Sequence, residues 1–117
     1  MERVRVAFRL QVRPELLDEY RAVHSPVRRE MLEVISASGR RNYSLFLDET
    51  DGSLFGYYEV DDDEAAQAHL AASEVATQWE AEMARFFVAT VGRADQAARR
   101  LPEVFNLSDQ LESSSPS

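Results

Sequence analysis

Residues 4–12 read Val-Arg-Val-Ala-Phe-Arg-Leu-Gln-Val, and this stretch decides the fold class. Apolar side chains occupy every second position from Val4 to Val12, while Arg, Ala and Gln fill the positions between them. A strict period of two is typical of a β-strand that is buried on one face, because successive side chains point to opposite faces of a sheet. We therefore expect a half-buried strand near the start of the chain.

The segment that follows, residues 14–39, predicts a long helix. Pro14 can open this helix, because the first helical turn leaves its N–H groups without intrahelical partners. Pro26 predicts a kink or break close to His24, since proline removes a helical hydrogen bond, and Gly39 is typical of a helix end. The apolar residues recur every three or four positions and so share one helical face. They are Leu16, Tyr20, Val23, Val27, Met31, Val34 and Ile35.

Two further alternating segments, residues 42–47 and 54–60, flank an Asp51-Gly52 turn and predict a β-hairpin. Residues 61–63 are all Asp, which favours the start of a short helix over residues 64–72. Ser73 can cap another helix that runs to about residue 88.

The C-terminal part predicts a polar connector over residues 91–100, a last short strand over residues 101–107 and a disordered Ser-rich tail over residues 108–117. Residues 1–107 are therefore expected to form a single domain. The order β-α-β-β-α-β is that of an α+β, ferredoxin-like fold, in which an antiparallel sheet carries its helices on one face. The free face of such a sheet can pack on a second copy, so we expect a homodimer.

The amino-acid composition limits the binding partners and the types of catalysis that we expect. The chain of 117 residues has a net charge of −8, which disfavours nucleic acid and anionic membranes as partners. It contains neither Cys nor Lys, so thiol nucleophiles, zinc–thiolate sites and Schiff bases are excluded. No apolar run approaches a membrane span, and the N-terminus does not have the pattern of a signal peptide, so we expect a cytoplasmic protein.

Four side chains are candidates for a binding or catalytic site, each with a structural alternative. Tyr20 and His24 lie four residues apart and so share one helical face, although Tyr20 also belongs to the apolar stripe and can simply fill the core. Trp79, the single Trp, can anchor the core or provide a flat wall for a sugar ring. Tyr43 can donate a hydrogen bond to a ligand or mark an ordinary strand entry.

The sequence resembles the L-rhamnose mutarotase family over roughly residues 4–107. The matching pieces occur in the family's order and with similar spacing. They are Tyr20-x-x-x-His24-x-Pro26, Gly39-x-x-Asn42-Tyr43, Leu47-Asp48, Leu54-Phe55 with Glu59, Trp79, and Glu103-Val104-Phe105-x-Leu107.

The resemblance implies a dimeric ferredoxin-like α/β barrel that interconverts the α and β anomers of L-rhamnose without cofactor or metal. It implies that His24 is the proton donor and that Tyr20, Tyr43 and Trp79 contact the sugar. A histidine suits this reaction, because opening a pyranose ring removes one proton from the anomeric hydroxyl and delivers one to the ring oxygen near neutral pH.

Two departures from the family bear on the choice of sugar. The family usually has two adjacent Trp where this chain has Trp79-Glu80, and Arg9 stands where the family tends to be apolar. Other interpretations stay open: a dimer that binds a sugar without converting it, a relative of cofactor-free monooxygenases with similar barrels, or a purely structural dimer.

Overall fold

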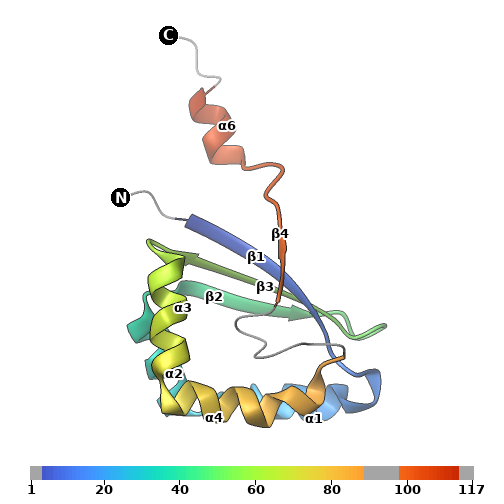
Figure 1. Cartoon of the computed structure of the whole chain (residues 1–117). Coiled ribbons are helices and arrows are strands. Elements are labelled where there is room, and N and C mark those ends of the chain that lie inside the picture. The colour runs from blue at the N-terminus through green and yellow to red at the C-terminus, as the bar shows by residue number, and fades with distance from the viewer. Residues whose placement is uncertain (1–3, 89–97, 114–117) are drawn as a thin grey trace.

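The computed structural model describes residues 4–88 and 98–113, which have an α+β fold (Figure 1). The strands are β1 (Val4–Gln11), β2 (Arg41–Leu47), β3 (Ser53–Val60) and β4 (Arg99–Leu101). The helices are α1 (Leu17–Val23), α2 (Arg29–Ser38), α3 (Asp63–Ala72), α4 (Glu74–Met83) and α6 (Leu107–Ser113), with 3-10 turns η1 (Pro14–Leu16) and η2 (Ala84–Phe86).

The four strands form one antiparallel sheet in the order β2-β3-β1-β4, which is the order of the expected ferredoxin-like arrangement. Strand β1 pairs with β3 along its full length, from Val4 opposite Val60 to Gln11 opposite Ser53. Strand β2 pairs with β3 through a bulge between Arg41 and Ser44. The expected hairpin and the half-buried first strand are confirmed.

The helices α1 to α4 form a layer on one face of the sheet, as expected (Figure 1). The long helix predicted over residues 14–39 is broken into α1 and α2 around Pro26, which cannot donate a helical hydrogen bond. Helix α2 ends at Gly39, whose φ of 98° lies in the left-handed region that favours glycine. None of the helices in the described ranges is long and apolar enough to cross a membrane.

The side chains that cap the first turns of α3 and α4 agree with the sequence analysis. The Asp62 side chain accepts a hydrogen bond from the Ala65 amide at 3.1 Å and starts α3. The Ser73 hydroxyl accepts from the Ala76 amide at 3.2 Å and starts α4. Each cap satisfies one first-turn amide that has no intrahelical partner, and Ser73 does so where α3 ends and α4 begins.

The core lies between the sheet and the helical layer. Its most deeply buried side chains come from β3, α3, η2 and the residue that follows β1: Val12, Leu54, Val60, Leu70 and Phe86. The Phe8 ring lies directly across Gly56, its register partner, where a Cβ atom would come within 2.0 Å of the ring. Glycine at position 56 is thus required by the packing of Phe8 against β3.

The C-terminal expectations need correction. The last strand is Arg99–Leu101 rather than residues 101–107, because Pro102 has no N–H with which to continue the ladder. Residues 107–113 form α6, where we expected disorder from residue 108; the Asn106 side chain caps this helix by accepting from the Asp109 amide at 3.0 Å. Residues 91–97 of the connector and residues 114–117 of the tail lie outside the described residues.

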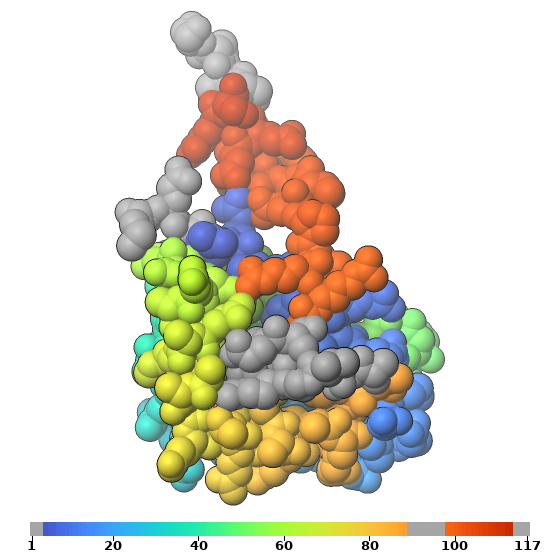
Figure 2. Space-filling model, in the orientation of Figure 1, coloured from blue at the N-terminus to red at the C-terminus, as the bar shows by residue number. Residues whose placement is uncertain are grey.

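The segment after β4 projects from the body of the molecule (Figures 1 and 2). Arg5 on β1 ties this segment to the sheet. The Arg5 Nε donates a hydrogen bond to Glu103 at 2.8 Å, and its Nη2 donates to Asp109. Its apolar side chains are largely exposed; Val104, for example, retains 89% of its accessible surface.

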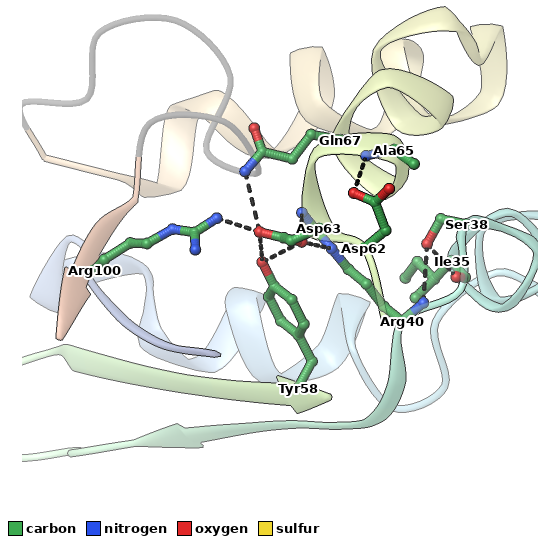
Figure 3. Close-up of polar contacts among 9 residues, drawn as sticks. All are labelled: Ile35, Ser38, Arg40, Tyr58, Asp62, Asp63, Ala65, Gln67 and Arg100. Carbon is green, nitrogen blue, oxygen red and sulfur yellow. Dashed lines mark hydrogen bonds and ion pairs between the residues drawn. The ribbon is translucent and has the colours of Figure 1, made fainter. Parts of the chain in front are cut away.

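A buried ion pair ties the helical layer to the sheet (Figure 3). Arg40, between α2 and β2, donates from Nη2 to Asp63 at 3.0 Å, and the two side chains are only 2% and 10% exposed. Asp63 also accepts hydrogen bonds from Tyr58 on β3 at 2.9 Å, from Gln67 at 3.3 Å and from Arg100 on β4. The sequence analysis treated Asp63 only as part of a helix start, and its central place here was missed.

Asp63→Ala is expected to lower the free energy of unfolding by about 3–5 kcal/mol, because it leaves the Arg40 guanidinium buried without its counterion. Urea denaturation at neutral pH measures this loss. Asp61→Ala is the matched control, since the Asp61–Arg41 pair is about half exposed on both sides and is worth roughly 1 kcal/mol or less. Equal losses in the two variants would contradict the role given to the buried pair.

Candidate functional site

A cavity opens between the helical layer and the sheet, in two adjoining lobes. The larger lobe has a volume of about 530 Å³, within the range of small-molecule sites, and the smaller has about 90 Å³. Eight residues line both lobes: Tyr20, His24, Arg40, Tyr43, Leu45, Leu54, Trp79 and Glu80. The four side chains singled out in the sequence, Tyr20, His24, Tyr43 and Trp79, are therefore brought together around one cavity.

His24 is the centre of an aromatic group in this cavity. Its ring stacks on Tyr20, with centroids 4.1 Å apart, as the four-residue spacing on α1 predicts. Trp79 and the same imidazole form a T-shaped pair, with centroids 5.5 Å apart. His24 is the residue that ends α1, just before the break at Pro26, so the interruption of the helix places it in the cavity wall.

The hydrogen bond of His24 fixes its tautomer. Its Nδ1 lies 2.8 Å from the Tyr20 carbonyl oxygen, which can only accept a hydrogen bond. In the neutral imidazole Nδ1 therefore carries the proton, and Nε2 holds the lone pair. Burial lowers the pKa of His24 below its ordinary value of 6.5, against the opposing effect of the bond to Tyr20. The imidazole is thus neutral at pH 7 and can accept a proton at Nε2.

Tyr20 is the most deeply buried of the four candidates, with 4% of its surface exposed. Burial raises the pKa of its phenol far above the usual range, and the nearby Tyr43 and Glu80 add to this shift. The phenol stays protonated throughout the physiological range and can only donate or accept hydrogen bonds. Its ring also packs edge-on against Phe86, so Tyr20 belongs to the core and to the cavity at once.

Tyr43 from the sheet and Trp79 from the helical layer both line the cavity. Tyr43, on β2, packs against Tyr58 with ring centroids 5.2 Å apart. Trp79, on α4, is 8% exposed and lies beneath the Arg28 guanidinium, 5.3 Å from its ring centroid. The Trp79 ring belongs to a buried hydrophobic cluster and also lines both lobes.

Other polar side chains of the cavity were not found from the sequence as site residues. Arg40, Tyr58, Gln67 and Arg100 line the smaller lobe, and all four bond to Asp63 behind them (Figure 3). No local motif marks this group, because its members come from four separate parts of the chain. Arg9, by contrast, lies away from the cavity and donates a hydrogen bond to the Ser53 hydroxyl at 3.2 Å.

Comparison with protein families matches residues 5–107 to the model of L-rhamnose mutarotase. A curated L-rhamnose mutarotase of Pectobacterium carotovorum is 40% identical over 76 residues, which cover 65% of this chain and 72% of that protein. One from Yersinia pestis is 36% identical over 77 residues, covering 66% and 74% of the two chains.

Solved structures agree on the fold. The L-rhamnose mutarotase FA22100 of Formosa agariphila superposes with a TM-score of 0.72 at 25% identity, covering 89% of this chain and 98% of that one. An antibiotic biosynthesis monooxygenase has a TM-score of 0.52 at 24% identity, covering 71% of this chain and 84% of that one. The second likeness concerns the fold alone.

The fluorescence of Trp79 should report the protonation of His24, because the two rings are in edge contact and the chain has no other Trp. We expect quenching as the imidazole becomes charged, with a midpoint below pH 6.5. The measurement is tryptophan emission against pH, with His24→Asn as the variant that removes the transition. A midpoint above 6.5 would contradict a neutral, buried His24.

Proposed function

Because the chain belongs to the L-rhamnose mutarotase family, we propose that it is an isomerase that interconverts the α and β anomers of L-rhamnose or a closely related aldose. The observation that carries this proposal is the neutral His24, whose Nδ1 is occupied by the Tyr20 carbonyl and whose Nε2 is left as a proton acceptor in the cavity wall. The chemistry needs a single proton shuttle in a site large enough for a monosaccharide.

The proposed reaction begins with neutral His24. Its Nε2 takes the proton of the anomeric hydroxyl, the electron pair of that O–H bond forms the carbonyl at C1, and the bond from C1 to the ring oxygen breaks. The imidazolium then gives its proton to the ring oxygen, so that the open-chain sugar is neutral and His24 returns to its neutral form. Rotation about the C1–C2 bond and the same steps in reverse give the other anomer.

This sequence of steps gives His24 both roles, base in ring opening and proton donor to the ring oxygen. The proton-donor role implied by the family resemblance is the second half of this cycle. Tyr20 is too weak an acid to transfer its proton, because burial raises its pKa far above neutrality. Its phenol is proposed to hold a sugar oxygen by a hydrogen bond while the imidazole moves the proton.

Tyr43 and Trp79 are proposed as the residues that hold the sugar against His24. A Trp face suits the apolar C–H face of a pyranose, and a Tyr hydroxyl suits a sugar hydroxyl. Both side chains line the two lobes together with His24, so a ring bound between them would lie within reach of the imidazole. No cofactor or metal takes part in the proposed steps.

His24→Ala is expected to abolish the acceleration of anomer exchange, a loss of about 10²–10⁴-fold, because it removes the proton shuttle. Saturation-transfer NMR on L-rhamnose measures exchange directly, with His69→Ala, an exposed histidine on α3, as the matched control. The wild-type rate should also fall as the pH drops through the midpoint measured with Trp79.

Two outcomes would redirect the proposal. Unchanged exchange in His24→Ala would remove this residue from the mechanism. Wild-type protein that binds the sugar but accelerates no exchange would favour the alternative, a non-catalytic sugar-binding module.

We also propose that the chain works as a homodimer. Phe46 and Phe55 are register partners on the sheet face opposite the helices and keep 65% and 41% of their surface exposed. Paired aromatic side chains of this kind are typical of a face that a second subunit covers. The projecting segment adds exposed apolar side chains: Val104, Phe105, Leu107 and Leu111.

Sedimentation at micromolar concentration should give twice the mass of one chain. Phe46→Asp should shift the protein toward monomer, because it places a charge in the proposed contact. Ala68→Asp is the control, since Ala68 is exposed on α3 in the helical layer. Monomeric wild-type protein would contradict the proposed dimer.

A further inference from the structure

Glu80 is a carboxylate in the wall of the cavity that holds Tyr20 and His24. It follows Trp79 on α4, is only 9% exposed and lines both lobes. Its charge acts on the Tyr20 phenol and adds to the rise in the pKa of that group. Burial of a carboxylate carries a desolvation cost, and Glu80 places a negatively charged hydrogen-bond acceptor in a largely apolar and aromatic wall.

Glu80 is the one carboxylate among the described residues that line the two lobes. The arginines in the same lining are each held by a carboxylate that stands outside it. The pairs are Arg21 with Asp18 and Glu49, Arg40 and Arg100 with Asp63, and Arg41 with Asp61. These arginines therefore do not require a negatively charged ligand to balance them.

A carboxylate recognises sugars through their hydroxyl groups. Its two oxygens are acceptors only and can take hydrogen bonds from neighbouring hydroxyls of one ring, while its charge repels a second carboxylate. The placement of Glu80 beside Trp79 and Tyr20 puts this acceptor next to the side chains proposed to hold the sugar.

We propose that Glu80 is a specificity-determining residue, which accepts hydrogen bonds from hydroxyls of the bound aldose and excludes sugars that carry a carboxylate. The inference rests on the proposed function only for the location of the sugar, and it does not depend on turnover. It assigns the site to neutral, polyhydroxylated aldoses.

The test measures binding and turnover separately. Three sugars of the same ring configuration differ only at C6: L-rhamnose has a methyl group, L-mannose a hydroxymethyl group and L-mannuronate a carboxylate. The fluorescence of Trp79, the single Trp, gives the Kd of each sugar, and anomer exchange by NMR gives the rate.

Glu80→Leu should weaken binding of L-rhamnose and L-mannose roughly 10- to 100-fold, the effect of removing a charged hydrogen-bond partner. Glu80→Gln keeps an acceptor oxygen and removes the charge. In this variant the Kd of each neutral sugar should stay within about tenfold of the wild-type value, and the Kd of L-mannuronate should fall by about tenfold or more. Glu74→Gln, an exposed residue of the same helix outside the cavity lining, should change none of these constants.

An unchanged Kd for L-rhamnose in Glu80→Leu, or an unchanged preference for L-rhamnose over L-mannuronate in Glu80→Gln, would overturn the inference. If Glu80→Leu does not fold, the preference of Glu80→Gln for L-rhamnose over L-mannuronate tests the inference. Wild-type protein that binds neither neutral sugar would also overturn it. Wild-type protein that binds but does not convert the sugar would overturn the mutarotase proposal alone, because the Kd values still test Glu80.

Discussion

The buried pair of Arg40 and Asp63 is the constraint on which the cavity depends. Two charges withdrawn from water are stable only when their remaining hydrogen-bonding capacity is filled, and Tyr58, Gln67 and Arg100 fill that of Asp63. These partners belong to β3, α3 and the edge strand β4, while Arg40 joins α2 to β2. One carboxylate therefore fixes the spacing between the sheet and the helices that enclose the cavity.

The same cluster occupies the polar groups of part of the cavity lining. Arg40, Tyr58, Gln67 and Arg100 face the smaller lobe, but their polar groups are drawn back toward Asp63. Tyr20 on α1, His24 at the end of α1, and Trp79 and Glu80 on α4 line both lobes. Side chains tied to Asp63 and the side chains proposed to act on a sugar thus line one cavity.

Local patterns in the sequence predicted most of the fold because they act within one element. The alternation over residues 4–12, the break at Pro26 and the spacing of Tyr20 and His24 depend only on neighbouring residues. Asp63 shows the limit: residues 61–63 are three identical side chains, and only the fold selects the last for burial beside Arg40, 23 positions away. At the C-terminus the apolar residues after position 101 suggested a longer strand, but Pro102 has no N–H to donate to the ladder and the strand ends at Leu101.

The environment of His24 links this architecture to the proposed reaction. Stacking on Tyr20 and contact with Trp79 remove water from the imidazole, which lowers its pKa and keeps it neutral. The carbonyl of Tyr20 then orients the ring so that Nε2 is the basic atom. Ring opening of a sugar already proceeds slowly in water, so a modestly tuned base is sufficient, and what the fold must add is a dry wall that orients it. The aromatic packing that makes α1 and α4 part of the core is the same packing that prepares the base.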